Sequence, residues 1–222
     1  NTAGKCKDKK CMHPNICKNL VFSHDMQMDL FAKCKENPKI KKVFVSSGIR
    51  HDLIIADKQY GQKYLEFISK NNISGQLKIA PEHICDNVLD AMNKPKQESF
   101  KKFVEMFLCI NKDLNQFLTC YFMVAHPCCS QDNIKELLAY IKKNLKFKPE
   151  QVQVFTPAPS TYSTLMYYTE RDINENEIFV EKDRNARMKQ KLTITQGFDK
   201  KGARPYGVKN KFRRNVYGRK KY

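Results

Sequence analysis

Four short apolar runs, each followed by turn-forming residues, constrain the fold of this chain more than any other feature. The runs are rich in valine, isoleucine or aromatic residues and lie at 41–49, 76–82, 119–127 and 151–159. Runs of this length and composition predict buried β-strands. At 222 residues, of which 41% are hydrophobic, the chain is long enough to bury one sizeable core.

Segments with a 3.6-residue apolar period lie between the runs and predict helices. The first stripe consists of Phe100, Phe103, Val104, Phe107 and Leu108, and the second of Ile134, Leu137, Leu138, Ile141 and Leu145. Ser130 is placed to cap the second helix, and Asp132 is favourable in its first turn. Further helices are expected at 24–36, 60–70 and 84–92.

This alternation of strands and helices implies parallel strands joined by right-handed crossovers. Four strands are too few to close an eight-stranded barrel. The chain is therefore predicted to hold an open α/β sheet or part of a barrel. It begins at Asn1 rather than at a methionine, which favours the partial barrel.

Polar residues follow each predicted strand, at the sheet edge where ligands gather in such folds. The candidates for cofactor binding are Ser46, Ser47, Arg50, Glu82, His83, His126 and Thr156. Arg50 suits a carboxylate or phosphate, although a surface ion pair is an equal alternative. His126 could bind a ligand or polarise a carbonyl group, and a hydrogen-bonded structural histidine is the alternative. The neighbouring Cys128 and Cys129 are expected to be small buried residues.

The cysteine pattern points to a reducing compartment and to one metal candidate. The chain has nine cysteines, an odd number, so they cannot all form disulfides with one another. Cys6, Cys11 and Cys17 follow the spacing C-x4-C-x5-C, with His13 between them, and could hold zinc or an iron-sulfur cluster. The spacing matches neither a zinc knuckle nor a standard cluster motif. A reduced loop without metal and a zinc-stabilised structural domain are both open alternatives.

The positive charge is concentrated at the end of the chain. Residues 181–222 contain fifteen Lys or Arg and three acids, so they carry +12 of the net charge of +18. Their low apolar content predicts a largely disordered tail after one helix near 184–192. We divide the chain into a folded part, 1–180, and this basic tail, 181–222. The tail is either a solvated segment or an arm that binds RNA or another polyanion.

Several classes of protein are disfavoured by what the sequence lacks. No apolar run is long enough to span a bilayer and the first residues do not resemble a secretory signal, so a soluble cytoplasmic protein without a membrane partner is expected. The sequence contains no Gly-rich phosphate loop, nucleophile elbow or HExxH motif. Nucleotide hydrolases, esterases and metalloproteases are therefore poor interpretations.

Five segments in order resemble the signature segments of the YgiQ-type family of radical SAM proteins. They are CMHPNICKNL, VFVSSGIRHDLII, GQLKIAPEHICDNVLDAMNKP, YFMVAHPCC and PEQVQVFTPAPSTYSTLMYYT, which together run from Cys11 to Thr169. The Lys- and Arg-rich tail is also similar to the carboxyl-terminal end of that family.

The resemblance implies a partial six-stranded (β/α) barrel, of which this chain would supply strands three to six. It also implies a [4Fe-4S] cluster and S-adenosylmethionine (SAM) at the strand ends, where SAM is cleaved reductively to a 5′-deoxyadenosyl radical. By position in such a barrel, Ser46, Ser47 and Arg50 would approach the SAM ribose or carboxylate or the substrate. Glu82 and His83 would face the same cavity, and His126 and Thr156 would lie on the adenine side.

The sequence departs from the family pattern in two respects. The C-x3-C-x2-C cluster motif and the glycine pair after the second strand are absent from these 222 residues. The isolated chain is therefore not expected to be active, and its implied partner is the missing amino-terminal half of the barrel. Cys128 and Ser160 also stand where the family has glycine, so a side chain would be strained there if those turns require a positive φ.

Two functions remain open from the sequence. The first is the carboxyl-terminal part of a radical SAM enzyme whose substrate is unknown. The alternative is a non-catalytic α/β binding module that contacts RNA or another polyanion through its basic tail. They differ in whether the upstream coding sequence contains the C-x3-C-x2-C motif.

Overall fold

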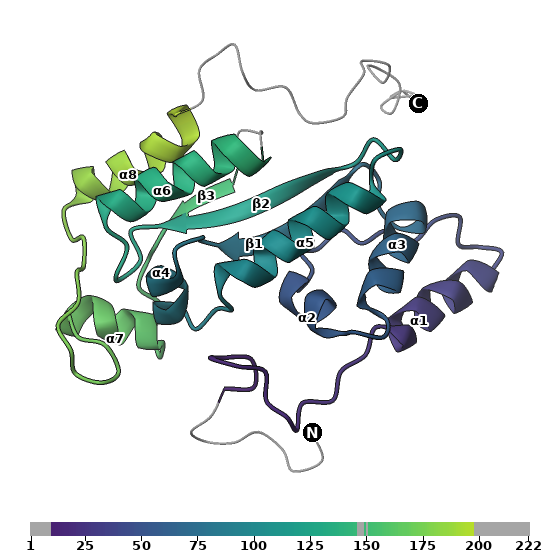
Figure 1. Cartoon of the computed structure of the whole chain (residues 1–222), viewed down its shortest axis with the longest axis horizontal. Coiled ribbons are helices and arrows are strands. Elements are labelled where there is room, and N and C mark those ends of the chain that lie inside the picture. The colour runs from purple at the N-terminus through teal and green to yellow at the C-terminus, as the bar shows by residue number, and fades with distance from the viewer. Residues whose placement is uncertain (1–9, 146–148, 150, 198–222) are drawn as a thin grey trace, which may run out of the picture.

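The computed structural model describes residues 10–145, 149 and 151–197, which form a parallel three-stranded sheet with helices packed against it (Figure 1). The predicted α/β class is confirmed. The elements in chain order are α1 (Asp25–Glu36), α2 (His51–Ala56), α3 (Gly61–Asn71), β1 (Gln76–Glu82), α4 (Asp86–Ala91), α5 (Gln97–Ile110), β2 (Phe117–Val124), α6 (Gln131–Tyr140), a π-helical turn (Ile141–Leu145), β3 (Gln151–Val154), α7 (Tyr162–Thr169) and α8 (Arg184–Gln196). None of the described helices is both long and apolar enough to cross a membrane.

Strand β2 lies in the middle of the sheet and pairs in parallel with both neighbours. Leu118 lies opposite Leu77 of β1, and Tyr121 lies opposite Gln151 of β3. The β1–β2 register shifts just before Glu82, whose φ is +66°. Because all three strands run in the same direction, their carboxyl ends lie at one end of the molecule, beside α4 and α7 (Figure 1).

One face of the sheet is covered by helices. Every second residue of β2 is buried, and the same alternation runs along β1. The core formed on this face includes side chains from α3, α4, α5, α6 and α8. The largest of its fully buried side chains include Tyr64, Phe100, Phe103, Phe107 and Phe122. The stripe predicted for 100–108 therefore packs inward, apart from Leu108, which is exposed.

The opposite face of the sheet is open within the described part of the chain. Its residues are partly or fully exposed and mix polar with apolar side chains: Gln76, Lys78, Ala80, Phe117, Thr119, Tyr121, Met123, Gln151 and Gln153. A hollow of about 610 Å³ lies over this face, between the strands and the α8 residues Met188 and Lys191. The sheet is therefore one-sided, which is unusual for parallel strands in a soluble protein.

Polar side chains cap the amino-terminal ends of α6, α7 and α8. The cap of α6 was predicted from the sequence. The Ser130 hydroxyl accepts a hydrogen bond from the Asn133 N–H at 3.3 Å, and the Asn133 side chain accepts one from the Ser130 N–H at 2.9 Å. This reciprocal pair satisfies N–H groups that a helix start leaves free. The cap predicted from the sequence is confirmed. Thr161 and Asp183 cap α7 and α8 without this reciprocity, since each side chain accepts a hydrogen bond from the N–H three residues later.

The strand predicted at 41–49 is wrong, so the described part of the chain has three strands where four were expected. Only Ile49 pairs with the sheet, through a single parallel bridge to Ile79. Two other backbone groups of the run bond to Asn72, the residue that follows α3. The Val45 N–H donates to the Asn72 carbonyl at 2.8 Å, and Asn72 Nδ2 donates to the Val43 carbonyl at 2.9 Å. Because Asn72 takes these groups, no ladder forms.

Three further features of the structure differ from the sequence-based predictions: the length of β3, two short helices and the burial of α1. β3 ends at Val154, earlier than the predicted run of 151–159, because Pro157 and Pro159 have no N–H to continue a ladder. The sequence reasoning did not predict α2 or α7, which are short helices of 6 and 8 residues. The helix predicted at 24–36 is present as α1, but it has no buried residue.

Helix α8 lies within the segment assigned to the basic tail, yet it packs against β3 and α6. Gln190 and Ile194 are buried. Gln190 Oε1 accepts a hydrogen bond from the Ala125 N–H at 2.8 Å, and its Nε2 donates to the Cys129 carbonyl at 3.3 Å. This part of the segment therefore belongs to the folded body. Residues 198–222, for which disorder was predicted, lie outside the described residues.

Replacing Gln190 with methionine should lower the free energy of unfolding by about 1–3 kcal/mol, because it leaves the buried Ala125 N–H and Cys129 carbonyl without a partner. The measurement is urea denaturation followed by circular dichroism. Gln196→Met is the control, since Gln196 is exposed at the end of the same helix and its replacement should change stability by less than about 0.5 kcal/mol. Equal effects of the two substitutions would contradict the anchoring role of Gln190.

Candidate functional site

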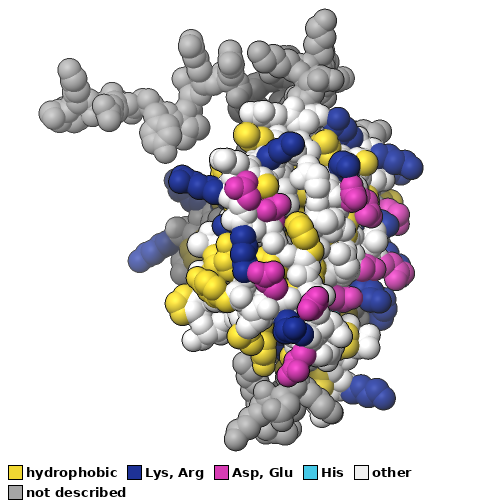
Figure 2. Space-filling model, turned by 90° about the vertical axis from the view of Figure 1, so that its left-hand side faces the viewer, with side chains coloured by type: hydrophobic (Ala, Val, Ile, Leu, Met, Phe, Trp, Pro, Cys, Tyr) yellow, Lys and Arg dark blue, Asp and Glu magenta, His cyan; other side chains and the backbone are white. Residues whose placement is uncertain are grey.

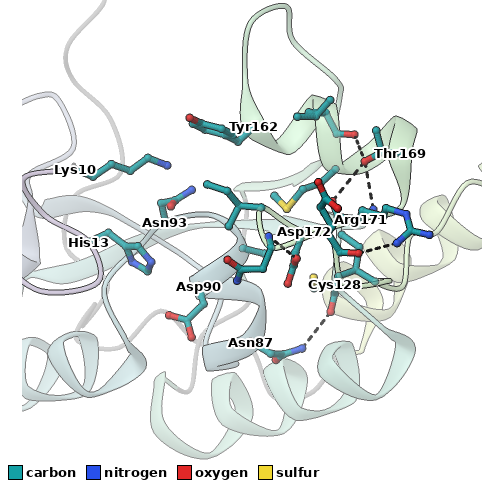
Figure 3. A pocket seen from close by; sticks show the side chains of 17 residues that line it. Lys10, His13, Asn87, Asp90, Asn93, Cys128, Tyr162, Thr169, Arg171 and Asp172 are labelled. Atoms are coloured by element: carbon teal, nitrogen blue, oxygen red, sulfur yellow. Dashed lines mark hydrogen bonds between the residues drawn. The ribbon is translucent and has the colours of Figure 1, made fainter. Parts of the chain in front are cut away.

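A cavity of about 630 Å³ lies at the carboxyl end of the sheet, between α4, α7 and the loop 170–178 (Figure 3). Figure 3 shows Lys10 and His13 on one side of it and Thr169 and Arg171 on the other. Its apolar lining comes from Leu165, Met166, Ile173 and Ile178, and its polar lining includes Asn87, Asp90, Asn93, Cys128, Tyr162 and Asp172. This mixture of an apolar wall and a few polar groups is typical of small-molecule sites.

Two charged residues that line the cavity, Arg171 and Asp172, form hydrogen bonds within the loop 170–178. Arg171 Nη1 donates to the Glu175 carbonyl at 2.7 Å, and Nη2 lies 3.4 Å from a carboxylate oxygen of Glu177. Asp172 accepts hydrogen bonds from the N–H groups of Asn174 and Asn176 at 2.8 and 2.9 Å. The side-chain hydrogen bond from Asn176, together with these backbone bonds, lowers the pKa of Asp172. Both residues therefore help to hold the wall of the cavity in place.

The Lys10 ammonium group lies 4.6 Å from the centre of the Tyr162 ring, and partial burial lowers its pKa. Around this cavity the surface carries exposed hydrophobic side chains beside charges of both signs, as Figure 2 shows for the α7 end of the molecule. Tyr162, Leu165 and Ile173 are each more than half exposed, at 53%, 57% and 73%. The mouth of the cavity is thus amphipathic.

None of the seven residues predicted to bind a cofactor lines this cavity. The sequence did not predict this cavity, because no sequence motif links α4 to α7 and the loop 170–178. These segments come together only in the folded structure. One signal was present, since Thr161 followed by YSTLMYYT has the pattern of a capped helix. The roles of the seven residues stay predictions, and their positions are described below.

Lys94, a residue that the sequence did not single out, lies beside both Arg50 and Glu82. Arg50 is bonded in bidentate fashion to Asp52, and one of these bonds joins Nε to Oδ1 at 2.8 Å. Burial of Asp52 opposes its ionisation, but the hydrogen bond and charge of Arg50 prevail and lower its pKa. Arg50 therefore forms an ion pair with Asp52, which is one of the two alternatives considered for it.

Lys94 lines a small hollow of about 120 Å³ together with Arg50 and His51. Lys94 Nζ also lies 3.4 Å from a carboxylate oxygen of Glu82. Burial raises the pKa of Glu82, while the charge of Lys94 opposes that rise. The available signal was the MNKP segment, in which Lys94 precedes a proline. Arg50 and Lys94 thus border one hollow, which Asp52 also lines, and each is paired with a carboxylate.

His83 and His126 are both buried and both committed to hydrogen bonds. His83 Nδ1 accepts from the Cys85 N–H at 3.0 Å. His126 Nδ1 lies 2.8 Å from the Pro127 carbonyl, to which it donates, so its Nε2 accepts from the Ser163 hydroxyl at 2.8 Å. The structural alternative for His126 is the geometry observed. These rings position the turns after β1 and β2.

Burial lowers the pKa of these histidines far below the usual value. The pKa of His83 falls to about 3, with a further contribution from nearby His126, and that of His126 falls to about 4. His51, also buried, has its pKa lowered to about 4 by burial and by the positive charges of Arg50 and Lys94. All three are neutral at neutral pH. They therefore cannot act as general acids there.

Ser46, Ser47 and Thr156 are exposed, and the structure does not bring them to a common cavity with the others. The Thr156 hydroxyl donates to the Val154 carbonyl at 3.4 Å. Of the three candidate metal ligands, Cys6 lies outside the described residues. Cys11 and Cys17 are unpaired and partly buried. Within the described ranges, no group of three His, Cys, Asp or Glu side chains is placed to hold a metal ion.

The turns at Cys128 and Ser160 adopt the left-handed backbone geometry that was considered for them above. The φ of Cys128 is +72° and that of Ser160 is +60°. A residue with a Cβ atom is strained in this region, so each turn stores a cost of about 1 kcal/mol or more. The Cys128 N–H donates to the Phe179 carbonyl at 2.8 Å, which helps to hold its turn.

Stability should fall as the pH drops below about 6.5, the value at which an unfolded histidine titrates. Below that pH the unfolded chain binds protons that buried His51, His83 and His126 do not, until the pH approaches their folded pKa values of about 3 to 4. Each contributes a loss of at most about 1.4 kcal/mol per pH unit. Urea denaturation at successive pH values measures this slope. His126→Gln should reduce this slope, and an unchanged slope would refute the assignment.

Ser160→Gly should raise the free energy of unfolding by about 0.5–1 kcal/mol, because glycine relieves the left-handed strain more than it adds chain entropy. Ser160 is exposed, so little packing is lost. Ser47→Gly is the matched control, since Ser47 is also exposed but has no positive φ. That control should be neutral or slightly destabilising. Thermal denaturation of both variants checks the prediction, and a destabilised Ser160→Gly would contradict it.

Comparison with known proteins places most of the chain in relation to one group. No family model matches the chain. It is 47% identical over 196 residues to a UPF0313 protein of Fusobacterium nucleatum, an alignment that covers 87% of this chain and 34% of the relative. A UPF0313 protein of Clostridium botulinum is 42% identical over 194 residues, covering 86% of this chain and 30% of that protein. A third, from Methanocella arvoryzae, is 45% identical over 171 residues, with 76% and 28% covered.

The chain spans about a third of the length of these curated relatives. Over most of its own length it is therefore similar to one part of the UPF0313 proteins.

Proposed function

We propose that this chain is the carboxyl-terminal part of the barrel of a YgiQ-type radical SAM enzyme, which cleaves SAM reductively at the carboxyl ends of its strands. The complete protein would be the active unit.

The open face of the parallel sheet is the observation that carries this proposal. Parallel sheets in soluble proteins are covered on both faces, either by helices or by closure into a barrel. Here helices cover one face, while Lys78, Tyr121 and Gln153 stand on the other. Closure by further strands would enclose these side chains as the lining of a barrel. Their mixed polar and aromatic character suits a lumen that holds a polar cofactor.

The likeness to known proteins supports the same reading. The motifs that resemble the YgiQ-type family run from Cys11 to Thr169, and the UPF0313 similarity covers 87% of the chain. Because the chain matches only about a third of its relatives, the rest of such a protein offers room for further strands.

The residues of this chain fit the two cofactors unequally. The described residues do not gather a ligand set for an iron-sulfur cluster. In the proposal, the cluster cysteines therefore come from another part of the complete protein. Arg50 and Lys94 line one hollow and would attract the carboxylate of SAM through the N–H groups that Asp52 and Glu82 do not occupy. Glu82 would hold the Lys94 ammonium in place, and His83 and His126 would support the strand ends without touching the ligand.

The test is anaerobic reconstitution of the complete protein with iron and sulfide, followed by an assay for 5′-deoxyadenosine from SAM under a reductant. About four irons per chain and production of 5′-deoxyadenosine are expected, as for a cluster held by cysteine thiolates. Complete protein that binds no cluster and leaves SAM intact would refute the proposal.

A pair of variants tests the barrel itself. Tyr121→Arg, on the open face, should abolish SAM cleavage in the complete protein because it places a buried charge in the lumen. Leu108→Arg is the control, since Leu108 is 42% exposed on α5 and its replacement should leave cleavage unchanged. If Tyr121→Arg is as active as the control, the open face is not the lumen.

A further inference from the structure

The cavity between α4, α7 and the loop 170–178 is not used by the function proposed above. This cavity and the hollow beside Arg50 have no lining residue in common. The two adjoin at one point of the chain, because Asn93 lines the cavity and the next residue, Lys94, lines the hollow. The cavity is also the larger, at about 630 Å³ against about 120 Å³. It is therefore a separate place at which a ligand can bind.

Two side chains of opposite charge line the cavity without an ion-pair partner in the part of the chain that the structure describes. One is Lys10, which extends toward the Tyr162 ring and lies 4.6 Å from its centre (Figure 3). The other is Asp90, near the end of α4. Neither belongs to any ion pair among the described residues. An unpaired cation and an unpaired anion in one cavity favour a ligand that carries both signs of charge.

The other charged groups of the lining leave it close to neutral. Arg171 donates to the Glu175 carbonyl, and Asp172 accepts from the N–H groups of Asn174 and Asn176. The Glu175 side chain lies on the exposed part of the loop. The lining thus includes two Lys or Arg residues and three acids. A ligand with a high net charge of either sign would meet groups of its own sign there.

Carboxamide groups line the cavity together with these charges. Asn93 and Asn174 are both part of the lining, and neither side chain has a hydrogen-bond partner among the described residues. A third carboxamide, that of Asn87, already donates to the Cys128 carbonyl at 3.2 Å. A carboxamide both donates and accepts hydrogen bonds, as a peptide group does. A peptide group in the ligand would therefore satisfy the two unpaired carboxamides.

Much of the remaining lining is aliphatic and reaches the surface. It comes from Leu165, Met166, Ile173 and Ile178. Leu165 and Ile173 are 57% and 73% exposed, so their apolar surface is still in contact with water. Apolar groups of a ligand would remove that surface from water, which favours binding. A wholly apolar ligand, however, would cover the polar groups of the cavity without bonding to them, which is costly.

We propose that this cavity binds a short apolar peptide with free termini, two or three residues long. Lys10 receives the terminal carboxylate, and Asp90 receives the terminal ammonium group. Asn93 and Asn174 bond to the peptide groups, and the aliphatic lining takes the side chains. Two or three extended residues span about 7–10 Å. The cavity volume of about 630 Å³ is within the range of small-ligand sites. Binding requires neither a cluster nor SAM, so it does not depend on the function proposed above.

Isothermal titration calorimetry of the complete protein, without added iron, sulfide or SAM, measures the binding of leucyl-leucine and of leucyl-leucyl-leucine. One site per chain is expected for at least one of these peptides. N-acetyl-leucyl-leucine has no ammonium group and leucyl-leucine amide has no carboxylate, so each should bind roughly tenfold more weakly than leucyl-leucine. Glycylglycine keeps both termini but has no apolar side chains, so its affinity should also be lower by roughly tenfold.

Two variants identify which residue holds which end of the peptide. Lys10→Met should weaken the binding of leucyl-leucine roughly tenfold and leave that of the amide unchanged, because the amide has no carboxylate to lose. Asp90→Asn should weaken the binding of leucyl-leucine by a similar factor and leave that of the acetylated dipeptide unchanged. The matched controls are Lys112→Met and Asp113→Asn, which are exposed between α5 and the start of β2, at the opposite end of the sheet. Both controls should bind like the unaltered protein.

A third variant tests the aliphatic lining. Leu165→Ser should weaken the binding of leucyl-leucine roughly fivefold, whereas Leu108→Ser, at another exposed leucine on α5, should not change it. The proposal is overturned if neither leucine peptide binds, if the blocked dipeptides bind as tightly as leucyl-leucine, or if the cavity variants bind like their controls. Tighter binding of octanoate than of leucyl-leucine would overturn it as well, since the ligand would then be an apolar anion and not a peptide.

Discussion

Strand β2 is hydrogen-bonded along both edges, to β1 and to β3, and the described structure is arranged around it. Leu118, Cys120, Phe122 and Val124 alternate onto its covered face and are buried there, which places the helices on that side. Its carboxyl end leads into a left-handed turn at Ala125, where Gln190 of α8 binds the backbone. The position of α8, the turn that carries His126 and one wall of the cavity through Cys128 all depend on this strand. A change in its register would move every one of them.

The sequence predicted the elements whose signals are local. Alternating burial along 76–82 and 119–124, the apolar stripes of α5 and α6, and the Ser130 cap all follow from residue spacing, and the structure contains them. The run at 41–49 has the composition of a strand. Its Val43 carbonyl and Val45 N–H, however, are hydrogen-bonded to Asn72 and not to a neighbouring strand. Residue patterns do not reveal such competition, because Asn72 and the run are far apart in sequence and meet only in the tertiary structure.

The candidate site shows the same division. Residues at strand ends could be named from the sequence, and Arg50 and Glu82 do lie close to a shared neighbour, Lys94. The protonation states and contacts of His83 and His126 could not be predicted from the sequence. Both depend on burial, which is a property of the whole packed core. The cavity between α4 and α7 was likewise beyond reach, since its walls meet only through tertiary structure. Chemistry carried by residue type is thus more readily predicted than chemistry carried by environment.

The anchoring of α8 couples two parts of the molecule mechanically. While Gln190 is docked, the Ala125 N–H is shielded from solvent; when the helix detaches, that amide is exposed and the turn after the central strand loses its support. Helix detachment and fraying of the strand end are therefore one cooperative opening, whose free energy deuterium exchange at Ala125 would report. The basic residues continue directly from Gly197, which closes α8 and packs near Leu138 of α6. A force applied to that end of the chain would thus act first on α8 and, through its contacts, on α6, the edge strand β3 and the turn after β2.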